Sequence, residues 1–253
     1  MLKETLFAET LAKKVGKLLL DNLGKISRIK EKSPKNFVTN VDLASEKLII
    51  SEIRKKYPDH QILSEEFGEK KTSSPYKWII DPLDGTHNFM HSFPIFGVSI
   101  ALEKNNEIIS AAINIPKLCQ SFIAEKGKSA FLNGKQIHVS KTARLYNSLI
   151  GMDSLFDKQL PKLTSILKKI SPKVHAIRFP GAAVMELTSV ASGTADAYIC
   201  ISTNPWDCAG GILLIKEAGG KITDYEGEPV NQYSKQFLAS NGILHSKILS
   251  TLN

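Results

Sequence analysis

Two aspartates, Asp81 and Asp84, stand three residues apart in the segment WIIDPLDGTHNF. The bulky apolar run over residues 77–80 predicts a strand that enters the core, and Pro82 is expected to end its hydrogen-bond ladder because proline has no backbone N–H. The chain would then bend, so that both carboxylates converge with the carbonyl of Leu83 between them. Two carboxylates and a carbonyl at a sharp corner are ligands for a hard cation.

Gly85 and Thr86 come next and allow a tight turn at the start of a short helix through Asn88. Backbone N–H groups at such a helix start can receive a phosphate. A metal on one side and amide donors on the other would form a phosphoryl pocket. The alternative is an ordinary surface turn, because Asp, Pro and Gly are common turn residues. The segment alone does not decide between the two.

Acidic residues also stand at the ends of other predicted elements, namely Asp42, Glu65, Glu66 and Asp207. Asp42 and Asp207 fall in the first turns of predicted helices, where an acid is favourable near the positive end of the helix dipole whatever its function. The two glutamates follow a predicted strand and could lie in a solvated loop. Their shared placement at element ends, rather than in mid-helix, favours a common site.

These acids would be positioned by two lobes that form one compact unit: an α+β lobe over residues 1–142 with most of the metal ligands, and an α/β lobe over residues 143–253 that completes the site. The fold class is therefore α/β, with an antiparallel sheet in the first lobe. Predicted strands cover 61–64, 77–80, 97–103, 107–115, 120–124, pieces around 133–134, 148–152, 174–177, 195–199, 221–223 and 237–239. Predicted helices cover 1–24, 40–57, 158–170, 182–191, 205–218 and 243–249.

Local signals fix some of these boundaries. Asn40 is expected to cap the second helix, and a polar stretch over residues 25–35 precedes it. Asn105-Asn106 and Asn133-Gly134 are typical of tight hairpin turns. The first helix is expected to be amphipathic, with an apolar face formed by Leu2, Leu6, Leu11, Val15, Leu18 and Leu19.

Composition excludes several classes of protein. No apolar run approaches the length of a membrane span, and the N-terminus does not look like a signal peptide, so we expect a cytoplasmic protein without membrane contact. Three cysteines without CxxC spacing, Cys119, Cys200 and Cys208, speak against disulfides or a thiolate metal site. The net charge of +8 comes from dispersed lysines, so binding to nucleic acid is compatible with the sequence but not indicated by it.

The segments WIIDPLDGTHNF and PWDCAGGILLIKEAGG together resemble the two signatures of the inositol monophosphatase family, which belongs to the magnesium-dependent, lithium-sensitive sugar phosphatases. FVTNVDLASE, ILSEE and GAAVMELTSVASGTADAY extend the resemblance over nearly the whole chain. It implies a layered α/β/α/β/α sandwich of the inositol monophosphatase/fructose-1,6-bisphosphatase type, a homodimer, a small phosphorylated substrate, and two or three Mg²⁺ ions per site.

The resemblance also implies which residues hold the metals. Glu65, Asp81 and the Leu83 carbonyl would hold the first ion, which polarises the attacking water. Asp81, Asp84 and Asp207 would hold the second, which stabilises the leaving oxygen, and Asp84 and Asp207 would also border the substrate. Two ions about 4 Å apart can clamp both apical oxygens of an in-line displacement, so no protein nucleophile is needed.

Further roles follow from the same resemblance. Gly85 and Thr86 would bind the phosphate through their N–H groups. The Thr86 hydroxyl, paired with Asp42, would orient the water and help to deprotonate it. Gly181 and Ala182 match a loop and helix start that line the substrate pocket in relatives, although they could also form only a small-residue packing face.

Two positions depart from the family pattern. Asn36 stands where relatives often carry an aspartate associated with a weaker third metal. Cys200 stands where many inositol monophosphate hydrolases have an acid that bonds ring hydroxyls. Because a thiol is a poor partner for a hydroxyl, we expect the preference for myo-inositol to be weakened.

Alternative functions stay open. A haloacid-dehalogenase type phosphatase also has an Asp-rich DGT segment, but its acids are two apart rather than three. A regulatory role in RNA or transcription-factor binding is suggested by bacterial relatives implicated in RNA polymerase antitermination complexes. For the enzyme, inositol 1-phosphate is the leading substrate, with fructose 1,6-bisphosphate, histidinol phosphate and 3′-phosphoadenosine 5′-phosphate as alternatives.

Overall fold

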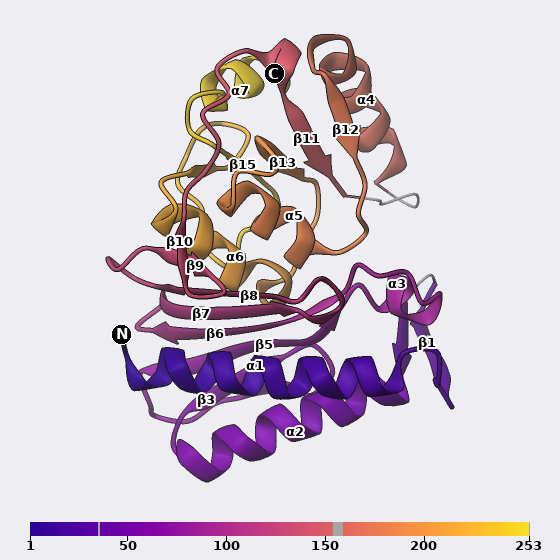
Figure 1. Cartoon of the computed structure of the whole chain (residues 1–253), viewed down its shortest axis with the longest axis vertical. Helices are drawn as coiled ribbons and strands as arrows, with labels where there is room; N and C mark the ends of the chain where they lie inside the picture. Colours follow the sequence, from indigo (N-terminus) through magenta and orange to yellow (C-terminus); the bar gives the residue numbers. More distant parts are fainter. Residues whose placement is uncertain (35, 154–158, 253) are drawn as a thin grey trace.

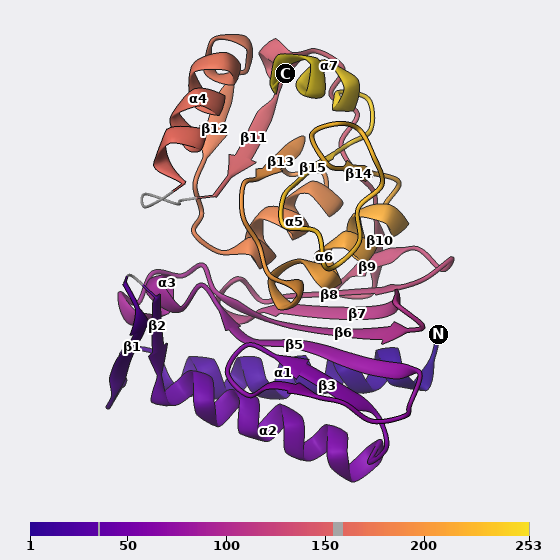
Figure 2. The same cartoon turned by 180° about the vertical axis from the view of Figure 1, so that it is seen from behind.

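Helices and sheets alternate in five layers in the computed structural model of the chain, which describes residues 1–34, 36–153 and 159–252 (Figures 1 and 2). Two N-terminal helices cover one face of an eight-stranded sheet, and two central helices cover its other face. A five-stranded sheet lies on the central helices, and two outer helices complete the stack. The predicted α/β/α/β/α architecture is confirmed.

The first layer consists of α1 (Lys3–Asn22) and α2 (Asn40–Lys56). α1 faces the large sheet with Thr5, Ala8, Leu11, Ala12, Val15, Gly16 and Leu19. Leu2 and Leu6, predicted to belong to this face, are 37% and 50% exposed, because at 100° per residue they lie outside the stripe that these buried residues form. The expected apolar face was therefore only partly right.

The large sheet has the strand order β10-β9-β8-β7-β6-β5-β3-β4, and every neighbouring pair is antiparallel except β3 with β5. Its strands are β3 (Gln61–Ser64), β4 (Gly68–Lys70), β5 (Tyr76–Asp84), β6 (Gly97–Lys104), β7 (Glu107–Ile115), β8 (Gln120–Glu125), β9 (Ala130–Leu132) and β10 (Lys135–Ile137). Both hairpin predictions are confirmed, since Asn105, Asn106, Asn133 and Gly134 all have positive φ angles. Strand β4 was not predicted.

Strand β5 contains a β-bulge that brings the two aspartates of the first motif to one face. Asp81 pairs with Ser99 of β6 and Asp84 pairs with Gly97, so three steps on β5 match two steps on β6. Ser99 and Gly97 share a face of β6, and their partners therefore share it too. The expectation that Pro82 ends the ladder was wrong. Proline is tolerated inside the bulge, where the ladder is already interrupted.

The polar stretch before α2 forms a small two-stranded sheet of β1 (Ile29–Ser33) and β2 (Asn36–Thr39). All residues of β1 are exposed, so the strand has no alternation of polar and apolar side chains to reveal it in the sequence. The short helix α3 (Thr86–Met90) lies next to this hairpin (Figure 1).

The second half contains the central helices α5 (Ala183–Ala191) and α6 (Pro205–Glu217) and the small sheet, with order β12-β11-β13-β15-β14. Its strands are β11 (Leu149–Met152), β12 (Ala176–Arg178), β13 (Ala197–Cys200), β14 (Lys221–Thr223) and β15 (Phe237–Ser240). Strand β11 runs parallel to β12 and β13. The outer helices are α4 (Leu160–Ile170) and α7 (His245–Leu252). Short 3₁₀ turns lie at Pro116–Leu118, Leu145–Asn147 and Ser171–Lys173.

All the predicted helices and strands of this half are present, with boundaries shifted by a few residues. Residue 158, where the helix that corresponds to α4 was predicted to start, lies outside the described part of the structure. Gly211 allows α6 to pack closely on α5, because a Cβ there would lie 2.5 Å from Leu187 Cβ. The chain leaves the large sheet after residue 137 and enters the small sheet at β11. The predicted lobe boundary near Thr142 stays a prediction. None of the described helices is long and apolar enough to cross a membrane.

Candidate active site

Asp42 lies at the start of α2, where it closes a capping box with Thr39. Its Oδ2 accepts hydrogen bonds from the backbone N–H of Thr39 at 2.9 Å and from the Thr39 hydroxyl. Thr39, not Asn40, therefore caps the helix, which corrects the sequence prediction. Asn40 instead accepts from the N–H groups of Ser27 and Arg28, and so ties the hairpin to the helix.

The Thr86 hydroxyl joins Asp42 to the aspartate motif. It lies 2.9 Å from Asp42 Oδ1 and 3.0 Å from the carbonyl oxygen of Leu83, and it can donate its single proton to one of them at a time. Gly85 makes this turn with a φ of 82°, and a Cβ there would lie 2.9 Å from the Ile95 carbonyl oxygen. Only glycine meets both conditions without strain.

Asp84 and Asp207 also lie at helix starts. Asp84 Oδ2 accepts a hydrogen bond of 2.6 Å from the N–H of Val184 in the first turn of α5, and the N–H of Ala183 also bonds the carboxylate. Asp207 Oδ2 accepts one of 2.8 Å from the N–H of Asn204, the N-cap of α6. The sequence indicated the helix position of Asp207, but it gave no sign that Asp84 meets α5.

Asp81 and Glu65 complete the set of predicted metal ligands. Asp81 is buried, and its Oδ1 accepts from the Leu83 N–H at 3.1 Å. Glu65 lies just after β3, and its Oε1 is 2.9 Å from Nζ of Lys32 on β1, which also bonds Glu66. Sequence reasoning missed Lys32 because it missed the hairpin that carries it.

The four carboxylates influence one another electrostatically. Burial raises the pKa of Asp84 to about 6 and the pKa values of Glu65 and Asp207 to about 7. Burial also raises the pKa of Asp81 well above its usual range, and repulsion from the other three adds to this. Hydrogen bonds to protein donors partly offset these increases for Asp84 and Glu65. Such mutual repulsion requires that the four side chains, from β3, β5 and α6, face the same region.

The donor chemistry of this region fits Mg²⁺. Among the described residues, no three His, Cys, Asp or Glu side chains are arranged closely enough to hold a metal ion by themselves. Mg²⁺ rarely needs such a cage, because it keeps several waters and binds through one or two carboxylates and the phosphate of a substrate. Carboxylate oxygens and the Leu83 carbonyl are the hard donors that it prefers.

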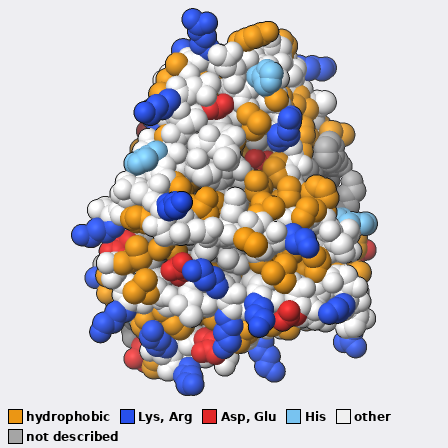
Figure 3. All heavy atoms as spheres, in the orientation of Figure 1, with side chains coloured by type: hydrophobic (Ala, Val, Ile, Leu, Met, Phe, Trp, Pro, Cys, Tyr) orange, Lys and Arg blue, Asp and Glu red, His pale blue; other side chains and the backbone are white. Residues whose placement is uncertain are grey.

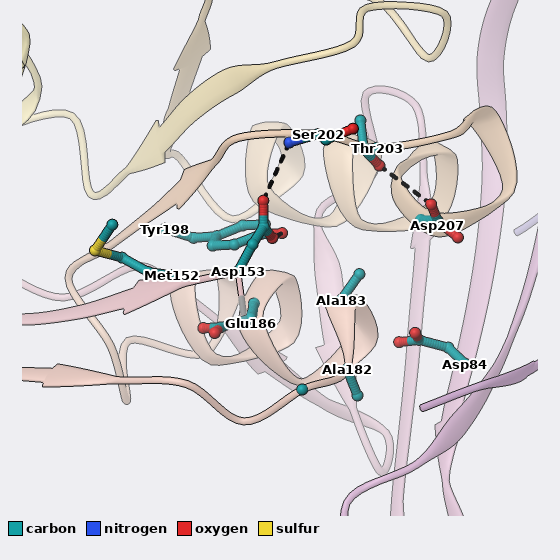
Figure 4. A pocket seen from close by; sticks show the side chains of 11 residues that line it. Asp84, Met152, Asp153, Ala182, Ala183, Glu186, Tyr198, Ser202, Thr203 and Asp207 are labelled. Carbon is teal, nitrogen blue, oxygen red and sulfur yellow. Dashed lines mark hydrogen bonds between the residues drawn. The ribbon is translucent and has the colours of Figure 1, made fainter. Parts of the chain in front are cut away.

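A cavity of about 200 Å³ extends from two of these carboxylates into the second half of the chain (Figure 4). Asp84 and Asp207 lie at one end, and Asp153, Glu186 and Tyr198 gather at the other. The cavity is also lined by Met152, Gly181, Ala182, Ala183, Ser202 and Thr203. Gly181 and Ala182 therefore line this cavity, and their role in binding a substrate stays a prediction.

Cys200 does not line the cavity. It is buried on β13, and its thiol hydrogen-bonds to the carboxylate of Asp153, which follows β11. Asp153, rather than the Cys200 thiol, therefore lines the cavity. The sequence gave two weak signals of this wall: an acid, Glu186, inside the apolar segment VMELTSV, and a glycine, Gly151, inside an apolar strand.

Comparison with known proteins identifies the family. The chain matches the model of the inositol monophosphatase family over residues 1–253. The chain belongs to the inositol monophosphatase family. This confirms the resemblance and sets aside the haloacid-dehalogenase alternative. Family members are metal-dependent phosphatases that hydrolyse phosphate monoesters, and this chain is an enzyme of that class.

Individual relatives cover nearly the whole chain. A fructose-1,6-bisphosphatase/inositol-1-monophosphatase of Thermotoga maritima is 35% identical over 248 residues, which are 98% of this chain and 94% of the relative. The Nus factor SuhB of Pseudomonas aeruginosa is 35% identical over 250 residues, 95% of this chain and 92% of that protein. The solved structure of a Thermotoga maritima IMPase has a TM-score of 0.93 at 34% identity, with 100% of this chain and 97% of that chain covered.

Proposed function

We propose that this family member is a Mg²⁺-dependent phosphomonoesterase for a small polyol or sugar phosphate, with inositol 1-phosphate as the first candidate. The observation that carries the proposal is the two-ended cavity. Carboxylates suited to Mg²⁺ border one end, and polar groups suited to hydroxyls line the other. Its volume of about 200 Å³ suits a ligand smaller than a typical drug.

We assign the metal ligands as the sequence motifs suggest. Glu65, Asp81 and the Leu83 carbonyl would hold one ion, and Asp81, Asp84 and Asp207 a second. When bound, the two ions supply an activated water and stabilise charge on the leaving oxygen. A third ion would bind more weakly. Asn36, whose side chain lies outside the described part of the structure, would offer only a neutral oxygen where relatives often have an acid.

The chain's own groups would orient the reactants. The N–H groups of Gly85 and Thr86 would bind the phosphate. The Thr86 hydroxyl, held within 3.0 Å of both Asp42 and Leu83, would orient the attacking water and pass a proton to Asp42. Burial raises the pKa of Asp42, which makes it a better proton acceptor than an exposed aspartate.

The decisive experiment measures phosphate release from inositol 1-phosphate, fructose 1,6-bisphosphate, histidinol phosphate and 3′-phosphoadenosine 5′-phosphate, with Mg²⁺ and again with EDTA. We expect Mg²⁺-dependent release from inositol 1-phosphate and its loss in EDTA. A clear preference for another of the four would reassign the substrate. Failure to hydrolyse all four in Mg²⁺, or release that EDTA leaves unchanged, would overturn the proposal.

A homodimer is the proposed assembly, and an apolar groove of about 380 Å³ supports it. The groove is lined in part by Phe93, which is 49% exposed, and Phe179, which is 39% exposed. Large exposed aromatic side chains beside an apolar groove are typical of a protein interface. Sedimentation of the wild type as a monomer at micromolar concentration would contradict this assembly.

A second candidate function is regulatory binding to RNA or to transcription factors. The similarity to the Nus factor SuhB favours it, and the net charge of +8 is compatible with an RNA partner. On the face shown in Figure 3, however, lysine and arginine side chains are scattered rather than gathered in one patch. Tight RNA binding by an Asp84→Asn variant would establish this role independently of catalysis.

The cytoplasmic location of the protein stays a prediction.

A further inference from the structure

Glu186 is a buried acid without a complete set of partners. It lies in the middle of α5 and is 4% exposed. The N–H of Met152 bonds its carboxyl group, but Oε1 has no hydrogen-bond partner among the described residues. Buried polar atoms are nearly always hydrogen-bonded, so an exception next to a cavity indicates a partner that arrives from outside the chain.

Gly151 on β11 makes the space for this carboxyl group. A Cβ at position 151 would lie 1.8 Å from Glu186 Oε2. Two ordinary apolar residues would pack α5 against β11 without leaving any polar atom unpaired. The combination of Gly151 and Glu186 therefore places a carboxyl group in the pocket wall at the expense of simple packing.

Asp153, the other acid at this end of the cavity, is occupied by the protein itself. Its carboxylate accepts from the Tyr198 hydroxyl, from the N–H of Ile201 at 2.5 Å and from the N–H of Ser202 at 3.2 Å. These bonds use most of its acceptor positions and fix the chain that follows β13. Glu186 is thus the group left to bind a ligand.

The protonation of Glu186 suits a hydroxyl partner. Burial, together with the nearby charge of Asp153, raises the pKa of Glu186 to about 9. At neutral pH the group is then an uncharged carboxylic acid, which can donate one hydrogen bond and accept another. A hydroxyl group can satisfy both, whereas a phosphate oxygen would only accept.

We infer that Glu186 recognises a hydroxyl group of the substrate, at the end of the cavity opposite Asp84 and Asp207, and that Asp153 is a positioning residue for this wall (Figure 4). The inference rests on the proposed function and deepens it. It names the substrate class as a cyclic polyol or sugar whose phosphate and recognised hydroxyl lie at opposite ends of the molecule.

The test compares a substrate with ring hydroxyls, inositol 1-phosphate, and one without, p-nitrophenyl phosphate. In Glu186→Met we expect the KM for inositol 1-phosphate to rise at least about tenfold, the effect of one lost hydrogen bond in a closed site. The kcat/KM for p-nitrophenyl phosphate should stay within about twofold of wild type. Glu186→Gln, which keeps a donor and an acceptor, should retain most of the affinity.

Gly151→Ala provides a second test that keeps the acid. The added Cβ must displace the carboxyl group, so this variant should show the same selective rise in KM. Equal losses on both substrates, or no loss on either, in a variant with wild-type circular dichroism would overturn the inference. Glu186 borders the apolar groove as well, so sedimentation of each variant checks that assembly is unchanged.

The two proposals fail in different ways. If the wild type hydrolyses none of the four phosphates named under the proposed function with Mg²⁺, the proposed function fails and this inference with it. If it hydrolyses one of them with Mg²⁺, and Glu186→Met leaves the KM for that substrate unchanged, the phosphatase mechanism stands and the role of Glu186 is wrong.

Discussion

Replacement of Asp84 by asparagine separates the role of this carboxylate in catalysis from its role in folding. Asparagine has nearly the same shape and can still accept the hydrogen bond from Val184, but it is a much weaker ligand for Mg²⁺. We expect turnover to fall at least about 100-fold, which corresponds to about 2.7 kcal/mol of lost transition-state stabilisation. The fold should persist.

The expected change in stability can be worked from the pKa of Asp84, which burial raises from 3.8 to about 6. A carboxyl group whose pKa is raised by folding lowers the stability of the protein as the pH rises from 3.8 to about 6, and the loss is complete above that pH, here about 3 kcal/mol at pH 7.5 without metal. Asparagine removes this penalty, in which the hydrogen bonds from Val184 and Ala183 to the charged form are already included. At 2–4 °C per kcal/mol for a chain of this size, the metal-free variant should therefore melt about 6–12 °C above the wild type.

Thermal melts with EDTA and with Mg²⁺, together with phosphate release, test both parts. Mg²⁺ should raise the melting temperature of the wild type much more than that of Asp84→Asn. Glu125→Gln is a matched control, because Glu125 is a buried acid that bonds the N–H of Leu2 at the start of α1, far from the site. Unchanged turnover in Asp84→Asn would refute the assignment of the site, and a metal-free variant that melts several degrees lower would refute the electrostatic argument.

Three further predictions follow from the same geometry. The metal-free protein should lose stability as the pH rises from about 4 to about 7 and then level off, since folding raises the pKa values of Glu65 and Asp207 to about 7. Added Mg²⁺ should flatten this profile, and melts across pH with EDTA and with Mg²⁺ check it. Gly85→Ala should cost about 2 kcal/mol in urea unfolding, because alanine is strained at φ 82° and its Cβ would press on the Ile95 carbonyl. Thr86→Val should lower kcat at least about tenfold with little change in KM, and an unchanged kcat would remove the hydroxyl from the mechanism.

The parts of the fold that could be predicted from the sequence are those with strong local patterns. The long helices, the antiparallel strands and the two asparagine turns each carry a periodicity or a turn signal of their own. Strand β1 carries none, because both of its faces are exposed, and Lys32 was missed with it. The continuation of β5 through Pro82 was missed for another reason: a bulge depends on the register with β6, which is not a local property.

Motifs likewise account for one end of the site and not the other. The carboxylates near Asp81 lie in recognisable segments, so their convergence could be expected. The hydroxyl-facing end depends on Asp153 and Glu186, which lie 33 positions apart in the sequence; Asp153 belongs to no motif, and the motif that contains Glu186 does not mark it as a pocket residue. Substrate choice was therefore predicted from Cys200 alone. In the structure that thiol sits behind Asp153, so its identity is a poor guide to what the pocket binds.

Helix capping and metal binding looked like rival explanations for these acids, but the structure makes them compatible. Asp42, Asp84 and Asp207 each bond the start of a different helix. For Asp84 and Asp207 the Oδ2 atom receives the backbone N–H, which fixes the direction in which the other oxygen points. The helix start also favours the ionised form that a metal requires. The hydrogen bond from the helix start thus orients each carboxylate and keeps it ionised, and both effects favour metal binding. A carboxylate at a helix start is therefore well suited to a metal site that must form from separate elements.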